Sequence, residues 1–354
     1  MKKIVLTGGG SAGHVTPNIA LVPKLRELGF DILYIGSQKG IEKDIIQKEN
    51  ITFKSISSGK LRRYFDIKNF TDPFRVVKGV FDARSILKKY RPDIVFSKGG
   101  FVTVPVVLAA HMLKIPVVIH ESDISPGLAN KISSKYADKI CCNFPETLAH
   151  IPKDKAVLTG CPIRSELLSG DPDKAREFTG LNCDKPVILV IGGSLGAVSI
   201  NTAVRDSLNE LLSKFSIIHI CGKGNVDNNI DHLGYVQYEY VSSQLKDIFA
   251  LADIVISRAG ANAICELLAL QKLNILVPLS AKASRGDQIL NAASFKKQGF
   301  SYVLDDEELN KDSLLAALDD VFSNKDKYIN SMQNASESDG VSSCINVITK
   351  VAKA

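Results

Sequence analysis

Two glycine-rich turns, each preceded by a short apolar strand and followed by a helical pattern, lie about half a chain apart. The first reads GGGSAGH over residues 8–14, and the second reads GGSLGA over residues 192–197. Glycine at a strand-to-helix turn lets backbone N–H groups come close to a ligand, and the start of the following helix favours negative charge. Two such turns predict two nucleotide-binding domains that face each other across a cleft.

Length and composition agree with two soluble domains. A chain of 354 residues is longer than one ordinary hydrophobic core organises. No apolar run approaches the roughly 20 residues that cross a bilayer, and the first residues carry no secretory pattern. Seven cysteines without zinc-site spacing predict reduced, buried thiols in a cytosolic protein, and the pair Cys141-Cys142 is interpreted as core filling.

Strand and helix patterns alternate along both halves of the chain. In the first half, strands are expected over residues 3–7, 31–35, 52–56, 94–97, 117–120, 139–142 and 156–158. In the second half, they are expected over residues 187–191, 217–220, 254–257, 275–278 and 302–304. This alternation is typical of parallel sheets covered by helices, so the fold class is α/β with two Rossmann-like domains.

The domain boundary is placed at residue 160. The first domain would comprise residues 1–160 and 337–354, and the second would comprise residues 161–336. The last helix, expected over residues 340–353, is long enough to return to the first domain.

The first turn lacks the rest of a dinucleotide or ATP motif. An NAD site needs a carboxylate at the end of the second strand, but this strand ends Tyr34-Ile35-Gly36-Ser37 without an acid. No Gly-Lys-Ser/Thr sequence makes a P-loop. His14 stands where the turn enters its helix, whose positive end favours a neutral imidazole that accepts a proton. His14 is therefore the first candidate for a general base, the alternative being a histidine that only caps or packs.

A second group of polar residues follows the strand at 117–120. His120 and Glu121 are rival catalytic residues there, because open α/β sheets bind ligands at the carboxyl ends of their strands. Asp123 either joins this site or caps the next helix. The turn Gly99-Gly100 lies on the same edge, as a further ligand loop or as a plain turn.

The second half offers residues suited to a nucleotide sugar. Arg258 follows a strand and precedes a helix that carries Glu266, which would hold a ribose diol or would be an ordinary surface glutamate. Gly286-Asp287-Gln288 and Asn291 form a polar segment suited to sugar hydroxyls. Asp171-Pro172-Asp173 matches an Asp-x-Asp metal motif, but Pro172 after a capping Asp171 favours a helix start, and no metal site is predicted.

Residues 60–91 are basic and aromatic. Phe74 and Phe81 lie among the cations Lys60, Arg62, Arg63, Lys68, Arg75, Lys78, Arg84, Lys88, Lys89 and Arg91. Basic residues beside exposed aromatic rings suit anionic lipid headgroups, and the alternative is a helix whose Phe74, Val77 and Phe81 face the core. Nucleic acid would also be attracted, but no nucleic-acid motif accompanies the segment.

Together, these motifs resemble those of the MurG family of peptidoglycan glycosyltransferases, which have the two-domain GT-B fold. The matching segments are GGGSAGHVTPN (8–18), SKGGFVTVP (97–105), HESDISPGLANK (120–131), GCPIR (160–164), GGSLGA (192–197), SRAGANAICE (257–266) and the loop from Asp287-Gln288 to Asn291. Each segment is a weak signal alone, but in this order they are specific, and the resemblance extends over the whole chain.

The resemblance implies an inverting transfer of N-acetylglucosamine from UDP-GlcNAc to the muramoyl 4-hydroxyl of lipid I, which forms lipid II. It places the protein at the cytoplasmic face of the cell membrane, on an anionic surface and without nucleic acid. No tightly bound cofactor is implied, and a divalent cation would only stimulate. The alternative is a UDP-GlcNAc 2-epimerase of the same architecture, which needs carboxylates for elimination and re-addition but no lipid-facing patch.

The resemblance also assigns residues. UDP-GlcNAc would contact Ser11, Ala12, Gly13, Arg164, Ser194, Val241, Arg258, Ala261, Asn262, Ala263, Glu266, Asp287, Gln288 and Asn291. The acceptor and its diphosphate would contact Gly9, Gly10, Gly99, Gly100, Asp123 and Asn130. The membrane patch would comprise Arg62, Arg63, Phe74, Arg75, Lys78 and Phe81. Asp287 stands where many members carry Gln, and Lys39 where some carry an acid.

Overall fold

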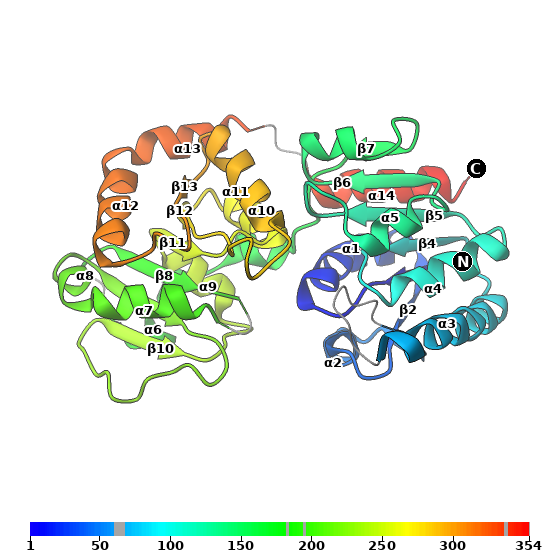
Figure 1. Ribbon diagram of the computed structural model, residues 1–354, viewed down its shortest axis with the longest axis horizontal. Coiled ribbons are helices and arrows are strands. Elements are labelled where there is room, and N and C mark those ends of the chain that lie inside the picture. Colours follow the sequence, from blue (N-terminus) through cyan, green and yellow to red (C-terminus); the bar gives the residue numbers. More distant parts are fainter. Residues whose placement is uncertain (60–67, 182–183, 194–195, 336–338, 354) are drawn as a thin grey trace. The chain divides into compact units, whose positions relative to one another are not determined.

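The chain divides into two compact units (Figure 1). A computed structural model describes residues 1–59, 68–181, 184–193, 196–335 and 339–353, without the side chains of residues 68–73. Unit 1 comprises Met1–Arg164 and Ser338–Ala354, and unit 2 comprises Ser165–Glu337. The predicted boundary was residue 160, and the first segment of unit 1 ends four residues later, at Arg164.

Among its described residues, unit 1 has a parallel sheet with the strand order β3-β2-β1-β4-β5-β6-β7. The strands are β1 (Lys2–Thr7), β2 (Phe30–Ser37), β3 (Thr52–Ile56), β4 (Ile94–Ser97), β5 (Val117–Glu121), β6 (Lys139–Cys142) and β7 (Ala156–Leu158). The helices are η1 (Ala12–His14), α1 (Thr16–Glu27), α2 (Ile41–Lys48), α3 (Lys68–Tyr90), α4 (Thr103–Met112), α5 (Leu128–Ser133), η2 (Pro145–His150) and α14 (Gly340–Val351). Each strand expected for the first half is confirmed.

Helices cover both faces of this sheet. Alternate residues of β1 point to opposite faces, so Leu6 joins a cluster with α1 and α14, whereas Val5 joins a cluster with α3 and α4. The C-terminal helix α14 packs against α1 through Cys344 and Ile348, both fully buried. The last helix therefore belongs to the core of unit 1.

Unit 2 has the strand order β10-β9-β8-β11-β12-β13, again parallel in the described residues. The strands are β8 (Val187–Ile191), β9 (Ser216–Ile220), β10 (Tyr235–Tyr238), β11 (Ile254–Ser257), β12 (Leu273–Leu276) and β13 (Tyr302–Val303). The helices are η3 (Ser165–Ser169), α6 (Pro172–Thr179), α7 (Val198–Asp206), α8 (Leu208–Lys214), α9 (Leu245–Leu251), α10 (Ala261–Ala269), α11 (Asp287–Lys297), α12 (Lys311–Ser323) and α13 (Lys325–Gln333).

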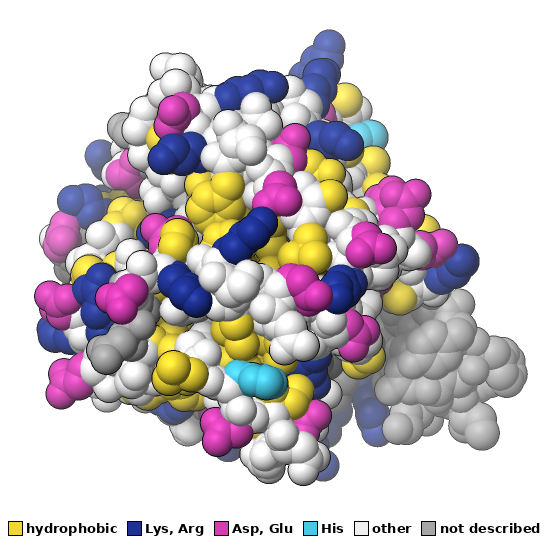
Figure 2. All heavy atoms as spheres, turned by 90° about the vertical axis from the view of Figure 1, so that its left-hand side faces the viewer, with side chains coloured by type: hydrophobic (Ala, Val, Ile, Leu, Met, Phe, Trp, Pro, Cys, Tyr) yellow, Lys and Arg dark blue, Asp and Glu magenta, His cyan; other side chains and the backbone are white. Residues whose placement is uncertain are grey.

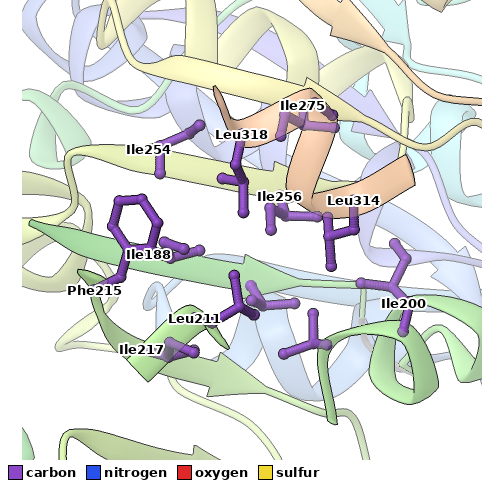
Figure 3. Packing of buried hydrophobic residues seen from close by; sticks show 14 of the residues in the cluster. Ile188, Ile200, Leu211, Phe215, Ile217, Ile254, Ile256, Ile275, Leu314 and Leu318 are labelled. Carbon is purple, nitrogen blue, oxygen red and sulfur yellow. The ribbon is translucent and has the colours of Figure 1, made fainter. Parts of the chain in front are cut away.

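The core of unit 2 lies between its sheet and the helices α7, α8 and α12 (Figure 3). Ile188 and Ile256 on neighbouring strands pack with Ile200, Leu211 and Leu314 on these helices. The strand β10 was not predicted, because this short edge strand is only partly buried and shows no apolar run.

The strand order changes direction at β1/β4 in unit 1 and at β8/β11 in unit 2. Open α/β sheets bind ligands at such switch points, outside the carboxyl ends of the strands. Both glycine-rich turns follow a strand of these pairs, so each lies where its own unit is expected to bind or to react.

Two smaller predictions are confirmed. Cys141 and Cys142 are fully buried in β6, and the described cysteines are free thiols. Asp171 caps α6, because its side chain accepts a hydrogen bond of 3.0 Å from the Asp173 N–H at a helix that begins with Pro172.

In the described part of the chain, no helix combines the length and the apolar character needed to cross a bilayer.

One face of unit 2 carries charges of both signs, scattered without a cluster of either (Figure 2). Two cross-helix pairs on unit 2 show this mixing, Lys214 with Asp319 at 3.2 Å and Lys311 with Glu210 at 2.6 Å.

Candidate active site

The second glycine turn connects β8 to α7. Gly193 has φ +91° and Gly196 has φ +76°, a region of backbone conformation that favours glycine. A Cβ on Gly196 would lie 2.0 Å from the Cys221 carbonyl oxygen, so a side chain has no room there. A Cβ on Gly193 would meet none of the described atoms within 4 Å, so the described part of the turn leaves space beside Gly193. Ser194 lies outside the described residues.

A cavity of about 760 Å³ opens beside this turn. Every described residue that lines it belongs to unit 2, including Gly192, Gly193, Gly196 and the first residues of α7. The predicted donor-binding residues Arg258, Ala263, Glu266 and Gln288 also line it. Ligand pockets typically measure about 300–1,000 Å³, so the cavity is large enough for a nucleotide sugar.

Arg258 is held by partners that the sequence did not suggest. Its Nη1 lies 2.6 Å from Asp306 Oδ1 and donates to the Val277 carbonyl at 3.1 Å, while Nη2 donates to Ser199 Oγ at 2.9 Å. Both ends of the Arg258–Asp306 pair are largely buried, and Asp306 and Ser199 also line the cavity. Asp306 follows β13, so the rule that ligands bind near strand carboxyl ends would have found it.

The other predicted donor residues that the structure describes are not among the residues that line this cavity. Val241, Ala261 and Asn291 are buried, and together with Asn262 and Asp287 they are not among the described lining residues. Ser11, Ala12, Gly13 and Arg164 belong to unit 1. The cavity thus brings together part of the predicted donor set.

Asn201, His219 and Tyr235 form a hydrogen-bonded cluster next to the second turn, because Asn201 binds the Cys221 carbonyl against which Gly196 lies. Asn201 donates to the Cys221 carbonyl at 3.0 Å, and its Oδ1 lies 3.0 Å from His219 Nε2. The Tyr235 hydroxyl lies 2.9 Å from His219 Nδ1. Burial, together with the charge of Arg205, lowers the pKa of His219 to about 3. His219 is therefore neutral near pH 7.

In unit 1, the first turn lies against the loop that follows β4. A Cβ on Gly100 would lie 2.1 Å from the Gly9 carbonyl oxygen and 3.2 Å from His14 Cδ2. Gly99 lies beside Asn130, and a Cβ on Gly10 would lie 2.7 Å from the Phe101 ring. The structure thus brings the two predicted glycine loops together around His14, which is half-buried at the end of η1.

His120 was expected as a rival catalytic base, which would have to contact the substrate, but the structure places it inside unit 1. Its side chain is fully buried, with Nδ1 2.8 Å from Lys98 Nζ and Nε2 3.2 Å from the Gly160 carbonyl oxygen. The carbonyl accepts from Nε2–H, which leaves Nδ1 to accept from the Lys98 ammonium. Both ring nitrogens are therefore used within unit 1, and this geometry favours a supporting role.

Glu121 also serves its own loop. It is 5% exposed, and its carboxylate accepts hydrogen bonds from Asp123 N–H (3.0 Å), Gly127 N–H (3.1 Å) and Asn130 Nδ2 (2.9 Å). Of the three predicted catalytic side chains, His14 alone is partly exposed.

The second strand ends without an acid, as expected, but the helix that follows it brings a carboxylate to the same place. Glu42, in the first turn of α2, is fully buried and accepts a hydrogen bond of 2.8 Å from the N–H of Ser37, the last residue of β2. It also accepts from Gly10 N–H at 3.3 Å. Sequence reasoning missed it because the acid lies on a helix after the strand rather than on the strand itself.

The exposed apolar face of α3 contradicts the core-facing alternative. Phe74 is 78% exposed, Val77 is 55% exposed and Phe81 is 61% exposed. Arg75 and Lys78 are exposed beside them. Arg62 and Arg63 lie outside the described residues.

Comparisons with known proteins agree with this geometry. Residues 4–142 match the glycosyltransferase family 28 N-terminal domain, and residues 187–347 match the C-terminal domain of the same family. The crystal structure of Acinetobacter baumannii MurG superposes with a TM-score of 0.77 at 25% identity, covering 99% of this chain and 100% of that chain. The kitacinnamycin glycotransferase shares the fold, with a TM-score of 0.75 at 14% identity, covering 99% of each chain. The chain is thus a two-domain glycosyltransferase of the GT-B type.

Curated relatives narrow the assignment. A Clostridium perfringens protein is 62% identical over 99% of this chain and 98% of its own, and a Lachnospira eligens protein is 58% identical over the full length of both. Both are named UDP-N-acetylglucosamine--N-acetylmuramyl-(pentapeptide) pyrophosphoryl-undecaprenol N-acetylglucosamine transferase. The chain belongs to the MurG family of peptidoglycan glycosyltransferases, and the 2-epimerase alternative is not favoured.

Proposed function

We propose that this protein transfers N-acetylglucosamine from UDP-GlcNAc to the muramoyl 4-hydroxyl of lipid I, with inversion at the anomeric carbon. The observation that carries the proposal is the 62% identity, over 99% of the chain, to a relative named for this transfer. The unit 2 cavity supports it, since it joins a glycine turn, a cation and a carboxylate.

In the proposed complex, UDP-GlcNAc occupies this cavity. The diphosphate lies at the second glycine turn, where backbone N–H groups and the start of α7 favour negative charge. Arg258 adds a positive charge held in place by Asp306. Glu266 accepts from the ribose hydroxyls, and Gln288 faces the sugar while its Oε1 accepts from Leu279 N–H at 3.0 Å.

The proposed acceptor site is the turn region of unit 1. His14 removes the proton of the acceptor hydroxyl as that oxygen attacks the anomeric carbon, a contribution of typically about 10²–10⁴ in rate. His120 and Glu121 hold the surrounding loops through the hydrogen bonds described above.

The leaving UDP gains negative charge as the bond to the sugar breaks. Preorganised amides and a fixed arginine stabilise such charge without reorganisation. In this proposal, Arg258 and the turn supply that stabilisation, no cofactor is tightly bound, and a divalent cation acts only as a stimulant.

Lipid I is membrane-bound, so the enzyme must reach a bilayer. We place α3 of unit 1 on the anionic cytoplasmic surface, through the exposed Phe74, Val77 and Phe81 with Arg75 and Lys78. Apolar side chains enter the headgroup boundary while the cations attract anionic lipids. Nucleic acid is not a proposed partner.

The test is an assay of purified full-length enzyme with UDP-GlcNAc and a lipid-linked muramoyl-pentapeptide diphosphate. The expected products are UDP and the disaccharide lipid, in equal amounts and only when the acceptor is present. Formation of UDP-ManNAc from UDP-GlcNAc alone would instead establish the epimerase. Absence of both products with a folded enzyme would contradict the proposal.

A further inference from the structure

The first glycine turn already contains an anion. Glu42 is 0% exposed, its Oε1 accepts from Ser37 N–H at 2.8 Å and from Ser37 Oγ at 2.5 Å, and its Oε2 accepts from Gly10 N–H at 3.3 Å. Two of these donors are backbone amides, one from the end of β2 and one from the turn itself. A buried carboxylate needs such partners, because desolvation without them is costly.

Three glycines make room for this carboxylate. A Cβ on Gly9 would lie 2.6 Å from Glu42 Cδ, one on Gly36 would lie 2.8 Å from Glu42 Cγ, and one on Gly40 would lie 2.1 Å from Glu42 Oε2. None of the three is among the glycines with positive φ. Their backbone conformations would accept other residues, so it is the occupied space that requires glycine. Glu42 takes this space at Gly9 and Gly40, whereas at Gly36 the Phe53 ring lies equally close, at 2.8 Å.

We propose that Glu42 is a built-in substitute for a ligand phosphate: its carboxylate fills the amide cradle of the first glycine turn. In a nucleotide-binding domain, such a cradle at a strand-to-helix turn takes a phosphate. Here, the second residue of α2 supplies the negative charge, and its place at a helix start is itself favourable. In this proposal, Glu42 takes the Gly10 N–H that the resemblance had assigned to the acceptor diphosphate, and unit 1 keeps the shape of a phosphate turn.

The same contact positions His14, a consequence that rests on the function proposed above. Gly10 lies four residues before His14 in the turn, and the Gly9 carbonyl and the His14 ring both lie against Gly100. Glu42 and Gly100 therefore hold the turn that carries His14. Loss of the carboxylate leaves the Gly10 and Ser37 donors unpaired, so the turn shifts. Glu42 is a positioning residue, because it acts on the reaction through the turn.

The experiment compares Glu42→Ala with Asp44→Ala in the full-length protein. Asp44 is exposed in the same turn of α2, so its loss changes the local charge but not the cradle. For Glu42→Ala we expect kcat to fall about 10- to 100-fold, since small misplacements of catalytic groups have effects of this size. The KM for UDP-GlcNAc should stay within about twofold, because donor binding belongs to unit 2. Asp44→Ala should match the wild type.

Rescue by a small anion separates a filled cradle from general damage. Sodium formate should raise the kcat of Glu42→Ala about tenfold and leave the kcat of the wild type unchanged. Sodium chloride at the same ionic strength is the comparison. Formate should also raise the thermal unfolding temperature of Glu42→Ala more than that of the wild type, because an added ligand stabilises the folded state that binds it. A folded Glu42→Ala that responds to formate in neither measurement would overturn the proposal.

Glu42→Gln keeps the experiment decisive if the alanine variant does not fold. It retains the volume but loses the charge, so it should lower kcat and show no response to formate, since its cradle remains filled. Wild-type kcat in Glu42→Gln would overturn the proposal. The thermal measurement does not depend on turnover, so the two proposals can fail separately. If the wild type transfers no sugar, the proposed function is refuted. If formate still stabilises Glu42→Ala in that case, the anion cradle remains supported.

Discussion

The two glycine-rich turns share a strand-turn-helix plan but differ in whether a side chain of the chain itself occupies the turn. At the first turn, the Glu42 carboxylate lies 3.3 Å from Gly10 N–H. At the second, a Cβ on Gly193 would meet no described atom within 4 Å, and the adjoining cavity is lined by Glu266 and by Arg258 in its pair with Asp306. A glycine turn therefore does not by itself specify a phosphate site. The neighbouring side chains decide whether the turn receives an anion from a ligand or from its own chain.

The difference also assigns separate tasks. A filled first turn is a rigid support, suited to hold His14 beside the loop of Gly100. In the proposed function, the second turn binds the diphosphate of the donor. If this comparison is right, substitutions in unit 1 change turnover, and substitutions at the cavity change donor affinity.

The largest expected effect is that of His14→Ala. Turnover should fall at least about 100-fold, because general-base catalysis contributes about 10²–10⁴ in rate, while the Kd for UDP-GlcNAc changes little. Steady-state kinetics and calorimetric titration of the donor measure the two quantities. His150→Ala, an exposed histidine of the same unit, is the control. Near-normal turnover would remove His14 from the mechanism and the catalytic task from unit 1.

Membrane binding should depend on unit 1 alone. Phe74→Ser with Phe81→Ser should lower the vesicle partition coefficient about 100-fold, since burying an exposed aromatic side chain contributes about 1.5–3 kcal/mol. The measurement is cosedimentation with phosphatidylglycerol vesicles.

The matched control for the membrane variant lies on unit 2, where Leu168 and Leu233 are 60% and 101% exposed. Leu168→Ser with Leu233→Ser should bind vesicles like the wild type. Equal loss in both variants would show that exposed apolar area, rather than α3, governs binding.

Glu266→Gln tests the donor side of the comparison. One carboxylate that accepts from a ribose diol contributes about 1.5–3 kcal/mol, so the KM for UDP-GlcNAc should rise about tenfold or more, with kcat nearly retained. Glu308→Gln, an exposed glutamate of the same unit, should have no effect. A fall in kcat without a change in KM would place Glu266 at the reacting centre instead of the ribose.

The smallest effect concerns stability against pH. Because burial lowers the pKa of His219 to about 3, the folded protein keeps it neutral, whereas the unfolded chain binds a proton below a pKa of about 6.5. The stability that comes from keeping His219 neutral is present above pH 6.5. It is lost as the pH falls from 6.5 towards 3, because the unfolded chain then gains a proton that the folded protein does not bind. From pH 7 to pH 5 the loss should be about 2 kcal/mol.

Calorimetric unfolding at pH 7 and pH 5 measures that loss. His219→Asn should lose less stability than the wild type between these pH values, and His232→Asn, an exposed histidine of unit 2, should behave like the wild type. The same pH response in His219→Asn and the wild type would show that His219 is not held neutral.

The strand pattern, both glycine turns and the family motifs could be read from the sequence because each depends on neighbouring residues. A buried parallel strand such as residues 187–191 is a continuous apolar run, and a turn that needs positive φ calls for glycine. The edge strand β10 was missed because it lacks such a run.

The sequence by itself determined the two α/β halves, the place of His14 and the residue types of the donor site, since short-range spacing encodes them. Only the tertiary structure decided that Glu42 fills the first turn, that Asp306 holds Arg258 and that His120 is used internally. The physical reason is that hydrogen bonds and ion pairs form between segments far apart in the chain. Their energies depend on distance and burial, which spacing along the sequence does not contain.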